Sequence, residues 1–69
     1  MTLDDLPEQQ LAVVKEIDAE DYESIRLRSM GVVPGVQILL LRRRPTMLHC
    51  RINTTEFALR SNTAKKIIV

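Results

Sequence analysis

Apolar and polar residues alternate in the N-terminal part of the chain and predict a strand followed by a helix. Within residues 11–17 successive side chains fall on opposite faces, the period of a half-buried strand. Residues 20–30 have acidic side chains near their start and Arg26 and Arg28 near their end, which suits the two ends of a helix dipole. We therefore expect a helix over 20–30, and an irregular lead-in over 3–8.

Glycine and proline mark the end of this helix and the turn that follows it. Gly31 fits the left-handed residue that commonly ends a helix, because it has no Cβ to clash there. In the sequence Val33-Pro34-Gly35-Val36, proline fixes φ at the second position and glycine allows a positive φ at the third, which predicts a type II turn. We interpret Gly31, Pro34 and Gly35 as structural residues.

A central strand begins at Val36 and has apolar side chains on both faces until it reaches three consecutive arginines: Arg42, Arg43 and Arg44. Because neighbouring strand residues point to opposite faces, we expect at least one of these arginines to pair with the acidic N-terminal segment. The other arginines are then free to form a basic surface.

The C-terminal part predicts three further strands. After Pro45, residues 47–52 alternate, so that one set of side chains points into the protein: Leu48, Cys50 and Ile52. Residues 55–60 form the next strand, with Phe57 and Leu59 inward. Ser61 begins a single helical turn, and residues 66–69 form the last strand.

These elements predict a mainly β fold in a single domain over residues 1–69. It has five strands, one α-helix between the first and second, and a short helical turn before the last. Strands this short hide their edges and build a core without large aromatic residues only if the sheet curls. A small five-stranded SH3-like barrel satisfies both conditions.

Composition narrows the class of protein further. Hydrophobic residues make up 45% and charged residues 28%, with two glycines and three prolines, as in an ordered protein. No wholly apolar run is longer than that from Ile38 to Leu41, far below the roughly 20 residues of a membrane-spanning helix. The single cysteine cannot form an internal disulfide, and the N-terminus shows no secretion signal. We therefore expect a cytoplasmic protein without a transmembrane segment.

The near-neutral total charge of +1 conceals a strong asymmetry. Residues 1–24 contain eight acidic side chains and Lys15, whereas residues 25–69 contain nine basic side chains and Glu56. The two parts carry −7 and +8, which sum to +1. Either they form two solvated faces that partly cancel, or the basic part supplies a docking patch.

Metal binding and catalysis find little support among the side chains. His49 and Cys50 are adjacent on a strand and point to opposite faces, so they cannot chelate one ion. The acidic residues from Asp18 to Glu23 lack the alternation and glycine of a calcium loop, and we expect them to cap the helix. His49 has no neighbouring group that predicts a catalytic triad, and no glycine-rich phosphate loop exists. We expect neither an enzyme nor a bound metal.

Nucleic-acid binding is the main alternative, because small barrels often bind single strands and the three arginines form a basic run. Single-strand binders stack bases on aromatic side chains, and this chain has only Tyr22 and Phe57. We therefore do not expect nucleic acid as the partner.

The segment Leu27 to Gly35, which reads Leu-Arg-Ser-Met-Gly-Val-Val-Pro-Gly, resembles the FeoA family of ferrous iron transport proteins. Further similarity lies in residues 2–6, 42–45, 57–60 and 64–69, in family order. The resemblance implies a cytoplasmic SH3-like barrel that assists the membrane ferrous iron transporter FeoB. Related barrels form the C-terminal domain of metal-dependent repressors of the diphtheria toxin repressor type, but no helix-turn-helix precedes this one.

The resemblance therefore favours a non-enzymatic accessory protein of ferrous iron uptake that interacts with a FeoB-type transporter. No cofactor is required; ferrous iron or another transition metal is implied by the family alone, with ligands shared with a partner. We expect the docking surface to use Arg28, Arg42, Arg43 and Arg44. The alternative is a small-barrel regulatory or nucleic-acid-binding module, and the edge of the last strand leaves self-association open.

Overall fold

The computed structural model describes residues 1–69. It contains six strands: β1 (Gln10–Val13), β2 (Glu16–Ile17), β3 (Gln37–Arg43), β4 (Met47–Ile52), β5 (Thr55–Arg60) and β6 (Ile67–Ile68). Three helical segments complete the fold: the 3-10 helix η1 (Leu3–Asp5), α1 (Asp21–Ser29) and α2 (Ser61–Ala64). None of these helices is long and apolar enough to cross a membrane.

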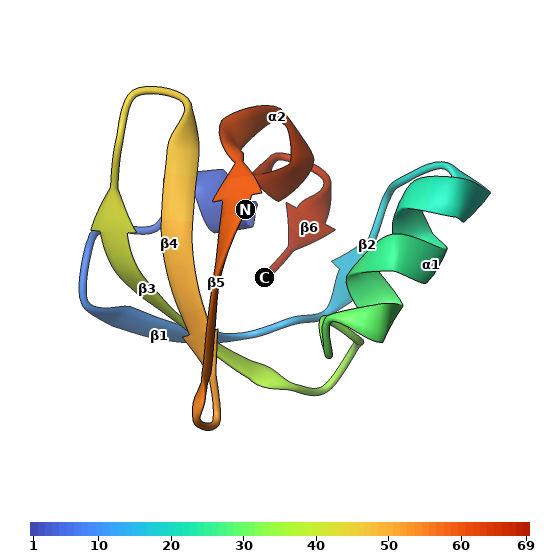
Figure 1. The fold of residues 1–69 in the computed structure, drawn as a ribbon, viewed down its shortest axis with the longest axis horizontal. Helices are drawn as coiled ribbons and strands as arrows, with labels where there is room; N and C mark the ends of the chain where they lie inside the picture. Colours follow the sequence, from blue (N-terminus) through green and yellow to red (C-terminus); the bar gives the residue numbers. More distant parts are fainter.

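The strands form two antiparallel sheets that face each other across the core (Figure 1). One sheet has the order β1-β3-β4-β5, and the other pairs β2 with β6. The last residues lie beside the first, because the backbone N–H of Val69 donates to the carbonyl of Met1 at 3.0 Å. The mainly β, SH3-like class is confirmed, although the barrel is not closed.

The predicted strand over residues 11–17 is two strands, β1 and β2, so the predicted number of five strands is corrected to six. The backbone N–H of Val14 donates to Val36 in the turn before β3, whereas that of Lys15 donates to Ile68 in β6. The chain thus passes from one sheet to the other between these two residues. Alternation continues through such a crossing, so hydrophobic periodicity alone does not reveal it.

The core consists of 13 buried side chains, all apolar: Leu3, Leu6, Val14, Leu27, Val32, Ile38, Leu40, Leu48, Cys50, Ile52, Leu59, Ala64 and Ile67. The inward set predicted for residues 47–52 is confirmed. Phe57 is half-buried against the core. The lead-in over residues 3–8 is more regular than expected, because η1 and the residue after it place Leu3 and Leu6 inside.

The predicted helix end and turn are both confirmed. Gly31 has a φ of +90° and Gly35 a φ of +95°, conformations that side chains with a Cβ rarely adopt. The backbone N–H of Val36 donates to the carbonyl of Val33 at 3.2 Å and closes the type II turn. The expected acidic cap is absent: Glu20 is the residue before α1, and its side chain makes no hydrogen bond to the backbone of the helix. Acidic side chains in the first turn interact favourably with the helix dipole without forming a capping hydrogen bond.

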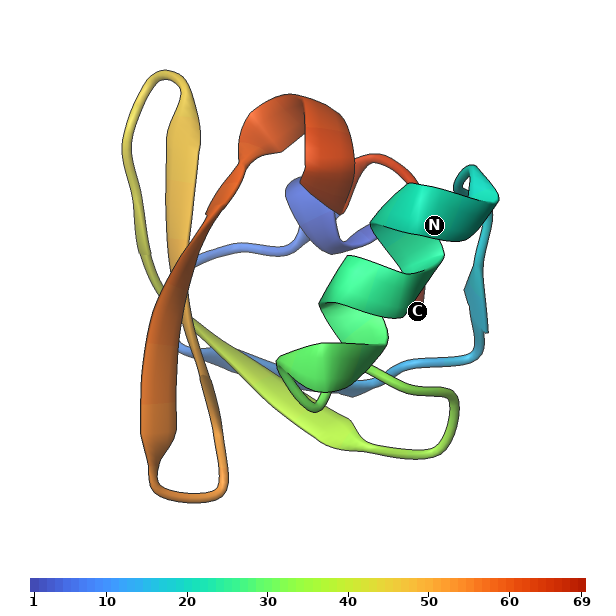
Figure 2. The same ribbon diagram turned by 45° about the vertical axis from the view of Figure 1, so that its right-hand side comes forward.

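Helix α1 lies on the outside of the molecule, in front of the other elements in Figure 2, and buries little of its surface. Leu27 is its one fully buried side chain, whereas Tyr22 and Ile25 are exposed. Its polar tie to the rest of the fold is Glu23, which accepts hydrogen bonds from Lys66 Nζ at 2.8 Å and from Thr63 Oγ1 at 3.1 Å. The side chains that hold the helix are therefore Leu27, through its apolar contacts, and Glu23, through its ion pair and its hydrogen bond.

Arg43 joins the end of β3 to the N-terminal segment. Its guanidinium donates to Asp4 Oδ1 at 2.9 Å and to the carbonyls of Asp4 and Leu6 at 2.6 Å each. Its backbone N–H donates to Glu8 Oε2 at 2.7 Å. The expected pairing of one arginine with the acidic segment is confirmed, and Arg43 is the one that makes it.

Replacing Arg43 by alanine should lower the free energy of unfolding by about 2 kcal/mol, because three hydrogen bonds to its guanidinium are lost. Arg44→Ala is the matched control, since Arg44 is exposed and its side chain makes no ion pair; its effect should stay within about 0.5 kcal/mol. Urea unfolding of both variants measures the difference. Equal losses in the two variants would contradict the anchoring role of Arg43.

The ion pair of Glu23 with Lys66 should contribute a constant stabilisation to the free energy of unfolding over a broad range of pH. The hydrogen bond from Lys66 holds the pKa of Glu23 below its ordinary 4.5, so this stabilisation is complete above that value and is lost as the pH falls through the folded pKa. Glu23 raises the pKa of Lys66 above its ordinary 10.5, so the alkaline loss occurs as the pH rises through that raised value. Urea midpoints from acid to alkaline pH should show both slopes, and Glu23→Gln should flatten them. An unchanged profile in that variant would exclude this pair as their source.

Candidate functional site

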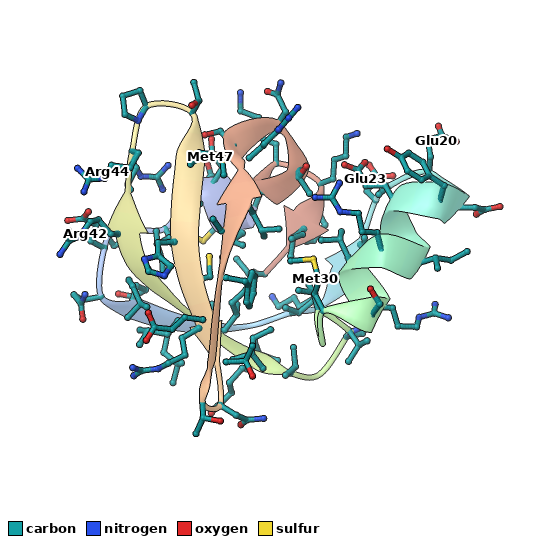
Figure 3. All side chains as sticks on the ribbon, viewed as in Figure 1. Glu20, Glu23, Met30, Arg42, Arg44 and Met47 are labelled. Atoms are coloured by element: carbon teal, nitrogen blue, oxygen red, sulfur yellow. The ribbon has the colours of Figure 1, made fainter.

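The three consecutive arginines do not share one role. A bulge in β3 shifts the register between Leu40 and Arg42, so that Arg42 lies opposite His49 and Arg43 opposite Leu48. Arg42 and Arg44 are exposed at the end of β3 (Figure 3). Neither makes an ion pair, whereas Arg43 is engaged with the N-terminal segment. Two of the three arginines are thus available to a partner.

Arg42 lines a shallow groove of about 320 Å³ on the outer face of the main sheet. Its walls also include Gln9, Leu41, His49, Arg51 and Glu56. The Nε2 atom of His49 lies 3.2 Å from Glu56 Oε1, and both side chains are about half exposed. The groove thus contains two guanidinium groups and one carboxylate, a surface of net positive charge.

Arg28 lies apart from this surface. It belongs to the last turn of α1 and lines a groove of about 260 Å³ with Lys15, Glu16 and Ser24. Helix α1 and the end of β3 lie on opposite sides of the molecule in Figure 1. The structure does not bring Arg28 together with Arg42 and Arg44, so the four arginines predicted as one surface form separate parts.

A third groove, which we call the basic groove, was not recognised from the sequence. It encloses about 520 Å³ at the end of the molecule where the β3–β4 turn meets α2, and it is lined by Pro45, Thr46, Met47, Arg60, Ser61, Asn62 and Lys65. The one signal in the sequence is that residues 57–69 contain three basic side chains and no acidic one. The fold is needed to see that the β3–β4 turn forms the opposite wall.

The residues considered for metal binding lie far from any common centre. His49 faces outward and Cys50 is fully buried, as their alternation predicted. No three His, Cys, Asp or Glu side chains are grouped so as to hold a metal ion. Among the acidic residues around α1, Glu23 is engaged with Lys66. Met30, between α1 and the sheet in Figure 3, packs against the core, whereas Met1 is exposed.

The FeoA domain family matches the chain over residues 1–69. The chain belongs to the FeoA family. This assignment links the chain to ferrous iron transport and accounts for the segment from Leu27 to Gly35, whose glycines and proline form the helix end and turn described above. No curated protein matches the FeoA-family chain in sequence.

Solved structures of FeoA proteins share both the fold and part of the sequence. FeoA of Stenotrophomonas maltophilia, solved with zinc and described as an SH3-domain protein proposed to activate bacterial ferrous iron transport, is 35% identical. The match covers 100% of this chain and 88% of that one, with a TM-score of 0.87. FeoA of Chlorobium tepidum is 28% identical over 99% of this chain and 67% of that one, with a TM-score of 0.91.

A manganese-dependent transcriptional repressor shares the fold alone. It is 23% identical, with a TM-score of 0.88, and the match covers 97% of this chain but 39% of the repressor. The FeoA fold thus occurs both as a separate small protein and as part of a longer regulator.

Cys50 should be unreactive in the folded protein. Burial raises the pKa of its thiol to about 11, against a smaller opposing effect of Arg43, so about one thiol in a thousand is ionised at pH 8. A thiol-specific reagent should label native Cys50 at least about a hundredfold more slowly than the urea-unfolded chain. The double variant Cys50→Ala/His49→Cys is the matched control, with its thiol on the exposed face. Native Cys50 that reacts as fast as this control would contradict the burial.

Proposed function

We propose that this FeoA-family protein is a cytoplasmic accessory factor of ferrous iron uptake that binds and modulates a FeoB-type membrane transporter. Family membership supports the link to iron transport. The observation that supports docking is the pair Arg42 and Arg44, which are exposed, carry permanent charge and have no ion-pair partner in the chain. Unpaired charges of one sign steer association with a complementary surface.

The docking surface in this proposal is the end of β3. Arg43 contributes by position, because its hydrogen bonds to Asp4 and Leu6 hold the strand end on which its neighbours stand. Arg28 forms a second, separate contact on α1. Two patches on one small protein suit a partner that contacts it from more than one side.

Iron is the cargo of the transporter in this proposal, and the accessory protein requires no cofactor. Ferrous iron favours several imidazole and carboxylate ligands that converge on one point. No three His, Cys, Asp or Glu side chains of this chain converge in that way. A complete site would therefore require ligands from the partner.

Charge reversal at the end of β3 should strongly reduce recovery of the transporter. A tagged chain carrying Arg42→Glu and Arg44→Glu should capture at least about tenfold less FeoB-type transporter from detergent-solubilised membranes of iron-starved cells, because two attractive contacts become repulsive. His49→Ala, on the same face, should capture normal amounts.

The same capture experiment separates the alternatives. Normal recovery by the folded charge-reversed variant would exclude the end of β3 as the docking surface. Recovery of nucleic acid or a soluble regulator in place of the transporter would favour the regulatory or nucleic-acid-binding module. Arg28→Glu, tested alone, measures the contribution of the second patch.

A further inference from the structure

The basic groove between the β3–β4 turn and α2 combines unpaired positive charge with a concave shape. Arg60 and Lys65 both line it and both are exposed. Neither side chain makes an ion pair, although Arg43 and Lys66 elsewhere in the molecule do. No carboxylate lines the groove. Two cations that lie together without a counter-charge repel each other, and an anionic ligand relieves that repulsion.

The remaining walls add hydrogen-bonding and apolar surface. Thr46, Ser61 and Asn62 contribute hydroxyl and amide groups, and Met47 and Pro45 contribute apolar atoms. The antiparallel pairing of β4 with β5 fixes this arrangement, because it places Met47 opposite Arg60. The backbone N–H of Ser61 donates to the carbonyl of Thr46 at 2.9 Å and fastens the β3–β4 turn to the start of α2. The two walls are thus joined before any ligand arrives.

We propose that the basic groove binds an acidic peptide segment of a partner protein, with Arg60 and Lys65 as the residues that receive its carboxylates. Arginine suits a carboxylate because its guanidinium donates two parallel hydrogen bonds, and lysine adds a point charge. The hydroxyl and amide side chains match peptide backbone groups, and Met47 accommodates an apolar side chain between the acids. This proposal does not depend on the identity of the transporter or on the arginines of β3.

Other anionic partners fit the groove less well. Bases of single-stranded nucleic acid stack on aromatic side chains, and none lines the groove: Tyr22 lies on α1, and Phe57 packs against the core. An anionic membrane surface is usually recognised by about four to eight clustered basic residues, and two line this groove. Hydrogen-bonding groups in a concavity favour a peptide chain over a flat surface.

The test uses the full chain and a fluorescein-labelled peptide, Gly-Glu-Glu-Leu-Glu-Glu-Gly, titrated by fluorescence anisotropy at low salt. The peptide with glutamine in place of glutamate is its neutral control. Saturable binding of the acidic peptide is expected, weakened roughly tenfold or more by Arg60→Gln/Lys65→Gln. The matched variant Arg26→Gln/Arg51→Gln removes the same charge from exposed positions outside the groove and should bind as the unmodified chain does.

Amide chemical shifts locate the peptide on the protein and show that each variant is folded. Perturbations centred on residues 46–47 and 60–65 are expected. Equal weakening in both double variants would overturn the proposal, since it would show a general charge effect. Undetectable binding of the acidic peptide, or tighter binding of a short single-stranded oligonucleotide or of phosphatidylserine-containing vesicles at the same groove, would overturn it as well.

Discussion

The bulge at Leu41 is the feature on which the arrangement of the basic residues depends. In a regular strand, Arg43 would share the outer face with Leu39 and Leu41, and Arg42 would point inward beside Leu40. The extra residue shifts the register, so that Arg42 lies opposite the exposed His49 and Arg43 lies opposite the buried Leu48. Arg43 can then reach Asp4 and fasten the N-terminal segment. One irregularity thus separates a structural arginine from its two exposed neighbours.

The fastening of the N-terminal segment matters because the core is small. Leu3 and Leu6 are two of 13 buried side chains, and both come from the segment that Arg43 holds. A single core of this size rarely supplies more than about 3–5 kcal/mol of stability. The hydrogen bonds of Arg43 therefore matter for the net stability. The pair of Glu23 with Lys66 ties α1, in which Leu27 is the one fully buried side chain, to the C-terminal part of the chain.

Periodicity and turn chemistry were sufficient to predict most of the fold. The alternation over residues 47–52 and the glycines at 31 and 35 act locally, so the sequence reports them directly. The crossing between β1 and β2 and the bulge in β3 were missed because both depend on hydrogen bonds to distant segments. The sequence likewise does not show that Arg28 lies apart from Arg42 and Arg44, since the side of the molecule that α1 occupies is set by tertiary packing.

Folding partly cancels the separation of charge that the sequence shows. Two of the three ion pairs, Arg43 with Asp4 and Lys66 with Glu23, join the acidic and basic parts of the chain and cancel charge where those parts meet. Arg42 and Arg44 remain without an ion pair at the end of β3, and Arg60 and Lys65 remain without one in the basic groove. A protein with a net charge of +1 thus keeps local regions of unpaired positive charge. A negatively charged partner would orient the molecule before contact, with the end of β3 and the basic groove leading.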